Sequence, residues 1–135
     1  TLDASTNMGS MFSIPMPKGW NETSALEVEI LWSPAAAVTG NVKWDVYISH
    51  QGDGDGDPAG WAVGPLSVTD ASNGVQYALH IASAVNTGVI SNVAENDVIN
   101  ILVVRNAADA ADTMAANALL RGIRVKYAID RANDE

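Results

Sequence analysis

The chain has 135 residues, of which 47% are hydrophobic and 17% are charged, and its formal net charge is −9. This size and composition predict a single compact domain and argue against a disordered chain. The negative charge and the small number of Lys and Arg residues argue against binding to nucleic acid or to an anionic membrane. The sequence contains no Cys, which excludes disulfides, thiolate metal sites and cysteine nucleophiles.

The first half of the chain is dominated by segments with the alternation of a β-strand. A strand is predicted over 10–14, and the prolines that follow in 15–20 favour a crossing between two sheets. Period-two alternation then predicts strands over 25–32 and 42–50. One face of each carries the apolar residues Leu26, Val28, Ile30 and Trp32, and Val42, Trp44, Val46 and Ile48. The opposite faces are expected to meet water or a hydrophilic partner, and they carry Glu27, Glu29, Lys43, Asp45 and Ser49.

The second half continues the same pattern in shorter segments. Further strands are predicted over 61–68, 76–83, 88–93, 97–104 and 119–129. With about eight strands, the expected fold is an all-β, jelly-roll-like antiparallel sandwich over residues 1–135. Residues 107–117 are expected to form a short helix or a turn. The last strand is expected to place Leu119, Ile123, Val125 and Tyr127 on one face, and Arg124 and Lys126 on the other.

The two ends of the chain have polar sequences. Residues 1–10 have the Gly-containing composition of a flexible arm, and residues 130–135 are expected to fray. Much of the apolar content between them is Ala and Val, which build a thin core. Such a domain would gain stability by burying surface against copies of itself.

A Gly/Asp loop over 52–57 is the first candidate for a ligand site. Asp53, Asp55 and Asp57 alternate with glycines, and three carboxylates on a flexible backbone suit a hard cation such as calcium. The position that would hold the final Glu of a calcium-hand loop is Gly64, and a solvated hairpin tip explains the same residues. No metal site or cofactor is therefore assigned.

Candidate catalytic residues are few. His50 and His80 are the only histidines, and neither belongs to a recognisable nucleophile or metalloprotease motif, which favours structural roles. Glu27 and Glu29 share one sheet face, as paired glycosidase acids would, but a solvated strand face shows the same spacing. No catalytic residue is assigned, and the chain is not expected to be an enzyme.

The remaining side chains of interest are the tryptophans and Arg105. Trp32 and Trp44 lie in phase with apolar neighbours and are expected in the core. Trp20 and Trp61 stand next to Gly; burial at the end of the sandwich is the favoured interpretation, and exposure for sugar stacking or a subunit contact is the alternative. Arg105 is expected to pair with the nearby acids Asp109 and Asp112 and so hold the loop.

Several short segments together resemble a group of virion proteins of tailed bacteriophages. They are Phe12-Ser-Ile-Pro15, Trp20-Asn, Ile30-Leu-Trp32, Gly40-Asn-Val-Lys-Trp44, Asp97-Val-Ile, Val104-Arg-Asn, Asp112-Thr and Lys126-Tyr127. The resemblance covers about residues 11–127. It implies a jelly-roll-like sandwich that assembles as a trimer on the virus particle, as a capsid decoration protein or as part of a head or tail fibre.

Two functions follow as expectations from this resemblance. The first is a homotrimeric capsid decoration, or cement, protein, made in the host cytoplasm, that binds the major capsid protein on the outer surface of the virion and stabilises the shell. The second is a carbohydrate- or receptor-binding module of a phage fibre. The second would use an exposed Trp and the Gly/Asp loop around a cation. No cofactor, nucleic acid or membrane is expected for the decoration protein, and the family supplies no catalytic residues for this chain.

Overall fold

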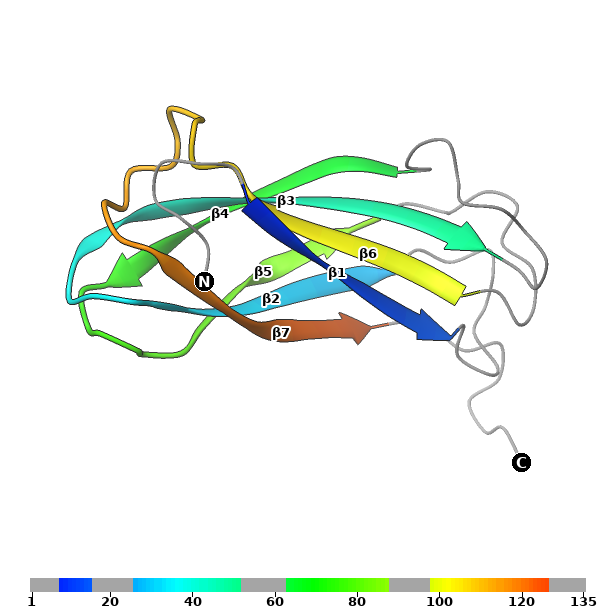
Figure 1. Ribbon diagram of the computed structural model, residues 1–135, viewed down its shortest axis with the longest axis horizontal. Coiled ribbons are helices and arrows are strands. Elements are labelled where there is room, and N and C mark those ends of the chain that lie inside the picture. Colours follow the sequence, from blue (N-terminus) through cyan, green and yellow to red (C-terminus); the bar gives the residue numbers. More distant parts are fainter. Residues whose placement is uncertain (1–7, 16–25, 52–62, 88–97, 127–135) are drawn as a thin grey trace.

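Two antiparallel β-sheets, packed face to face, make up the part of the chain that the computed structural model describes, residues 8–15, 26–51, 63–87 and 98–126 (Figure 1). The larger sheet has the order β1-β6-β3-β4 and contains β1 (Met8–Pro15), β6 (Val98–Arg105), β3 (Thr39–Gln51) and β4 (Val63–Asn73). The smaller sheet has the order β5-β2-β7 and contains β5 (His80–Asn86), β2 (Glu27–Pro34) and β7 (Ala118–Lys126). The all-β sandwich expected from the sequence is confirmed, and the seven strands found in these residues agree with an expected number of about eight.

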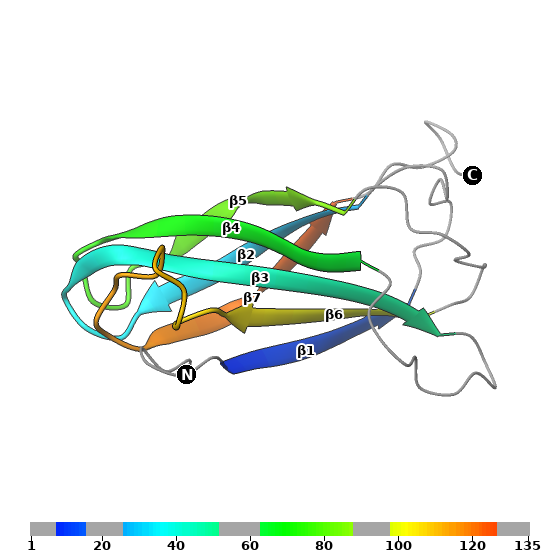
Figure 2. The same cartoon turned by 90° about the horizontal axis from the view of Figure 1, so that it is seen from above.

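The chain changes sheet at almost every connection. Of the strands in the described residues, only β3 and β4 follow each other within one sheet. Every other pair of consecutive described strands is divided between the two layers, which Figure 2 shows from above. Strands that are hydrogen-bonded neighbours are therefore often far apart in sequence, as β1 and β6 or β2 and β7 are. Among the described strands, β1 and β7 are edge strands of different sheets.

The core contains the two rows of apolar residues that the alternation placed inside. Each of these side chains on β2 and β3, and Leu26 just before β2, is at most 1% exposed. Trp32 and Trp44 face each other across the layers, with ring centroids 6.0 Å apart. The indole N–H of Trp32 donates a hydrogen bond to Asp70 Oδ2 on β4 at 2.9 Å, which ties the smaller sheet to the edge of the larger one.

On the outer face of the larger sheet, polar side chains meet hydrophilic partners, one of the two alternatives expected for it. Asp45 and Ser49 are only 6% and 1% exposed. Their polar groups can be buried because neighbouring side chains supply hydrogen bonds. Asp45 accepts hydrogen bonds from Ser67 and Asn106, and the Ser49 hydroxyl accepts one from Asn100. Hydrogen-bonded polar side chains therefore lie on this face, and the expected hydrophilic contact is made within the chain itself.

The phase of the last strand was predicted wrongly for its first half. The pairing of β7 with β2 shifts register between Leu31 and Trp32, so that one extra β7 residue, Arg121, is accommodated. Because of this bulge, the inward side chains are at even-numbered positions before Arg121 and at odd-numbered positions after it. The β7 residues that are buried or pack against the core are Ala118, Leu120, Ile123 and Val125, and Leu119 is not among them.

Other strand limits differ from the prediction for local reasons. β4 runs five residues beyond 68, because its last residues pair with the start of β3. β5 begins at His80 rather than 76, since the preceding segment turns with positive φ at Gly74 and Tyr77. Residues 107–117 form turns and no helix, so the turn alternative is confirmed. The predicted strand 88–93 and both chain ends, 1–7 and 127–135, lie outside the described residues.

Candidate functional site

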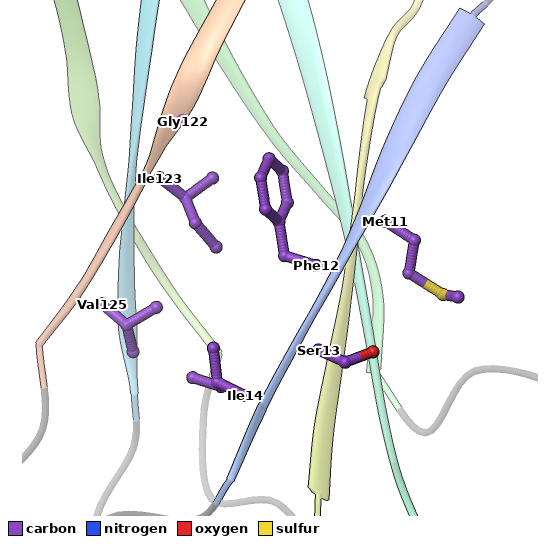
Figure 3. Close-up of a pocket in the computed structure, with 7 residues that line it drawn as sticks. All are labelled: Met11, Phe12, Ser13, Ile14, Gly122, Ile123 and Val125. Carbon is purple, nitrogen blue, oxygen red and sulfur yellow. The ribbon is translucent and has the colours of Figure 1, made fainter.

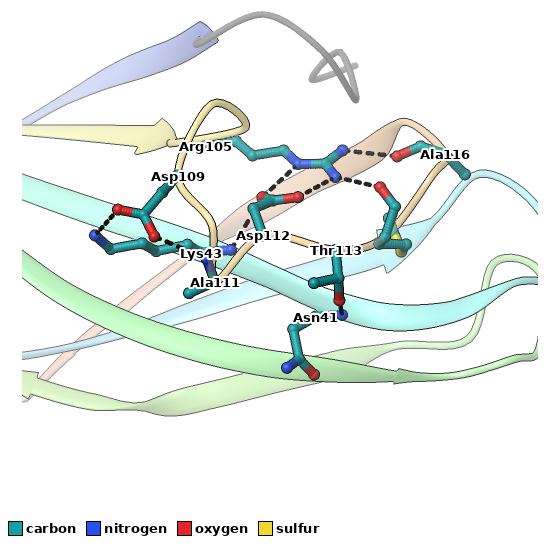
Figure 4. A network of polar contacts seen from close by, with 9 residues as sticks. Asn41, Lys43, Arg105, Asp109, Ala111, Asp112, Thr113 and Ala116 are labelled. Carbon is teal, nitrogen blue, oxygen red and sulfur yellow. Dashed lines mark hydrogen bonds and ion pairs between the residues drawn. The ribbon is translucent and has the colours of Figure 1, made fainter.

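A buried Arg–Asp pair holds the loop between β6 and β7 (Figure 4). Arg105 at the end of β6 is completely buried, and the Asp112 side chain is only 1% exposed. The guanidinium donates from Nη2 to Asp112 Oδ1 at 2.8 Å and from Nε to Oδ2 at 3.0 Å, a two-pronged geometry that only Arg provides. It also donates to the carbonyl oxygens of Met114 and Ala116, at 2.8 and 2.7 Å. Arg105 thus fixes both the acid and the backbone of the loop.

The same loop is also fastened to the beginning of β3. Asp112 Oδ2 accepts a hydrogen bond from the backbone N–H of Lys43, and Thr113 Oγ1 accepts one from the N–H of Asn41. The N–H groups of Thr113 and Met114 both donate to the Asn41 carbonyl. The loop is therefore a rigid extension of the sandwich. The predicted Arg105–Asp112 pair is confirmed, but as a buried structural lock.

Asp109, the other acid predicted to pair with Arg105, has a different partner. Its carboxylate accepts a hydrogen bond from Lys43 Nζ on β3 at 2.8 Å. This hydrogen bond raises the pKa of Lys43 and lowers the pKa of Asp109. The sequence showed only that Asp109 follows Arg105, whereas the approach of β3 to the loop depends on the sheet pairing.

A groove lies between β1 and β7, one edge strand from each of the two sheets (Figure 3). Phe12 and Ile14 of β1 point toward Ile123 and Val125 of β7, whereas Met11 and Ser13 point away on the other side of β1. Its volume is about 630 Å³, and its seven lining residues include no titratable side chain. The inward side chains Phe12, Ile14, Ile123 and Val125 make a lining that suits an apolar side chain.

Exposed apolar side chains gather on and just before β5. Among the residues that the structure describes, six large hydrophobic side chains are exposed, and four of them form what we call the β5 patch: Val75, Tyr77, Leu79 and Ile81. Their exposed fractions lie between 44% and 55%. Ala82, the residue after Ile81, is fully buried, so β5 carries apolar residues on both of its faces. This patch was not predicted, although apolar residues occupy every second position from 75 to 81 in the sequence.

The predicted histidine and glutamate candidates do not converge. His50 lies on β3 of the larger sheet, and His80 lies on β5 of the smaller one. The His80 ring packs against Trp32, with centroids 4.9 Å apart, and its Nε2 accepts a weak 3.4 Å hydrogen bond from the Asn73 N–H. His80 therefore faces the interior, whereas Glu29 alternates with the buried residues of β2 and faces outward. Within the described ranges, no three His, Asp or Glu side chains come together to hold a metal ion.

Glu29 is engaged by cations on β7. Its carboxylate accepts a hydrogen bond from Arg124 Nε at 2.7 Å, and Lys126 Nζ lies 3.5 Å away. The hydrogen bond from Arg124 lowers the pKa of Glu29. A general acid of a glycosidase needs a raised pKa, so the environment of Glu29 is that of a structural ion pair.

We expect Arg124→Gln to return the Glu29 pKa toward the usual glutamate value, because the charged hydrogen bond is removed. The lowered pKa stabilises the fold at pH values above the unfolded value of about 4.3, and this contribution is lost as the pH falls through the folded pKa. Carboxyl NMR titration of Glu29 measures the change. Arg121→Gln is the matched control, because Arg121 bonds Ser33 and Tyr77. An unchanged Glu29 pKa in Arg124→Gln contradicts the expectation.

Of the aromatic and acidic candidates, two tryptophans lie in the described part of the chain. Trp32 and Trp44 are in the core, as predicted. Trp20, Trp61 and the Gly/Asp loop with Asp53, Asp55 and Asp57 lie outside the described residues. In the described part of the chain, no helix is long and apolar enough to cross a membrane.

Comparison with known proteins gave no significant match to any protein family, curated protein or solved structure.

Proposed function

We propose that the protein is a structural component of a bacteriophage virion: a homotrimeric decoration protein that binds the outer capsid surface, contacts the major capsid protein and stabilises the shell. The observation that carries the proposal is the β5 patch, an exposed apolar surface on a rigid two-sheet scaffold. Contiguous exposed apolar side chains favour an interaction with another protein.

The use of charge in the scaffold supports the same role. Arg105 and Asp112 are buried against each other, Lys43 pairs with Asp109, and Glu29 pairs with Arg124. These side chains hold loops and strands in place, which is what a protein that resists mechanical stress requires. The mechanism is cross-bridging: each trimer contacts neighbouring capsomers through several subunits, so that separating the capsomers breaks several contacts at once.

The alternative is a carbohydrate- or receptor-binding module of a phage fibre. It needs an aromatic platform, and Trp32 and Trp44 do not provide one because both are fully buried. A platform from Trp20 or Trp61, or a cation held by the Gly/Asp loop, falls outside the described residues. The sandwich with its apolar patch therefore favours the decoration protein.

The proposal is tested by sedimenting the purified protein with capsids assembled from the major capsid protein of the same virus. We expect saturable binding and a higher temperature of capsid disassembly. Serum albumin sedimented with the same capsids is the control for trapping. Absence of binding contradicts the proposal, and binding to a glycan array together with a calcium-dependent melting temperature would support the fibre module instead.

A further inference from the structure

We propose that Asn73 is a site of spontaneous covalent modification in the folded protein. Its side-chain amide is lost when the backbone nitrogen of Gly74 attacks it, and aspartate or isoaspartate is left at position 73. The site lies where β4 ends and the chain turns toward β5. The reaction needs no partner protein, so the site is independent of the proposed function.

The sequence singles out this asparagine. Asn73-Gly74 is the only place in the chain where Asn is followed by Gly. A side chain on the following residue hinders the approach of its backbone nitrogen to the asparagine amide, and Gly removes that obstacle. Every other Asn in the sequence is followed by a residue that carries a Cβ.

The attacking nitrogen lies just beyond the strand pairing. Asn73 is the last β4 residue that pairs with β3, opposite Thr39, and Gly74 follows it with φ +82°. The Gly74 N–H donates to the Ser72 hydroxyl at 3.2 Å, the long limit for such a bond. The nitrogen is therefore held by one weak side-chain contact and not by the sheet.

The carbonyl that is attacked is held and polarised by the same turn. Asn73 is exposed, and its Oδ1 accepts a hydrogen bond from the Val75 N–H at 3.0 Å. This bond folds the side chain back along the two residues that follow it, which keeps the amide beside the Gly74 peptide. An N–H that points at the oxygen also stabilises the negative charge that develops there during the attack.

The chemistry requires only water and its hydroxide ion. Hydroxide takes the proton of the Gly74 nitrogen, the nitrogen bonds to Asn73 Cγ, and the Cγ–Nδ2 bond breaks. Nδ2 takes up a proton and leaves as ammonia, so that a five-membered succinimide ring remains. Water opens the ring at Cγ to give aspartate, or at the backbone carbonyl carbon to give isoaspartate.

Other described asparagines lack this combination. Asn100 is only 6% exposed, and its Nδ2 donates to Ser49 and Gln51. The Nδ2 of Asn106 donates to Asp45 at 3.0 Å. Asn117 is exposed as Asn73 is, but the next residue is Ala. Asn117 is therefore the internal comparison within the same molecule.

The products would alter a packed connection between the two sheets. The Asn73 N–H donates to His80 Nε2 of β5 at 3.4 Å, and a Cβ on Gly74 would lie 3.2 Å from Thr39 Cγ2. Isoaspartate adds one methylene to the main chain at this point. Both products also place a carboxylate two residues before Val75, the first residue of the β5 patch.

The test is to incubate the full chain in mildly alkaline buffer and to follow each asparagine by peptide mapping with mass spectrometry. A synthetic peptide of residues 69–78 supplies the rate of the same sequence without the fold. We expect Asn73 in the folded protein to react within about tenfold of the peptide's rate, and Asn117 to keep its amide over the same period. A folded protein that reacts more slowly than this overturns the proposal, because the fold then protects Asn73.

Isoaspartate is detected separately by enzymatic methylation of its free carboxylate. Asn73→Ser should remove this label, and Asn117→Ser is the matched control that should retain it. Both residues are exposed, and far-UV circular dichroism checks that the variants fold. Equal labelling of the two variants would place the modification elsewhere in the chain and overturn the assignment.

Discussion

Replacing Arg105 by Met is expected to lower the free energy of unfolding by about 3 to 5 kcal/mol, because Asp112 would remain buried without its cation. Two backbone carbonyls, those of Met114 and Ala116, would lose their donor as well. The measurement is urea unfolding followed by tryptophan fluorescence, which reports on the core through Trp32 and Trp44.

Two further variants separate charge from geometry. Arg105→Lys keeps the positive charge but lacks the planar fork that bonds Asp112 twice, so we expect it to recover only a small part of the loss. Lys43→Met removes the partly exposed pair with Asp109, and its effect should be much smaller. The assignment of a structural lock would be wrong if Arg105→Met and Lys43→Met unfolded at similar urea concentrations.

The second large effect is expected for Gly40→Ala, near the start of β3. Gly40 has φ +125°, a conformation that costs other residues about 1 to 3 kcal/mol. An added Cβ would also lie 2.7 Å from the Met114 Cα and 2.9 Å from the Met114 nitrogen. Because these are backbone atoms of the locked loop, they cannot move aside easily, and overpacking adds about 1 to 3 kcal/mol.

Gly122→Ala is the matched control for this prediction. Gly122 also has a positive φ, of 156°, but an added Cβ meets no atom within 4 Å. Only the conformational cost should therefore appear, and the unfolding midpoint of Gly122→Ala should lie between those of the wild type and Gly40→Ala. Equal midpoints for the two variants would show that the contact with Met114 has no energetic consequence.

Features of this fold that depend on residues close in sequence could be predicted, whereas those that depend on residues distant in sequence could not. The β2 and β3 faces were predicted correctly because alternation is a local property of the chain. The burial of Asp45 was missed because its partners, Ser67 and Asn106, come from β4 and from the loop after β6. The phase of β7 failed for the same reason, since a bulge is set by pairing with β2 and not by the β7 sequence alone.

The candidate sites were harder to predict than the strands, because most of them are formed by residues that are distant in sequence. The pair between Arg105 and Asp112 was predicted because the two residues are close in sequence, but its burial was not. The groove between β1 and β7 had no sequence signal, since residues 11–14 and 122–125 come together only when both sheets have formed. The β5 patch carried a local signal, alternate apolar residues. This signal could be interpreted only with the structure, which shows that Ile81 is exposed and that Ala82, on the opposite face of the strand, is buried.

The alternation of the chain between the two sheets has a consequence for how the protein reaches its native state. β2 forms the centre of the smaller sheet, yet one of its two partners is β7, the last strand described. During synthesis β2 cannot pair on its β7 side until residues 118–126 have left the ribosome. Long waits of this kind expose apolar strands to other nascent chains and are typical of slowly folding β-proteins. We therefore expect the smaller sheet to be completed only after β7 has been synthesised and has paired with β2.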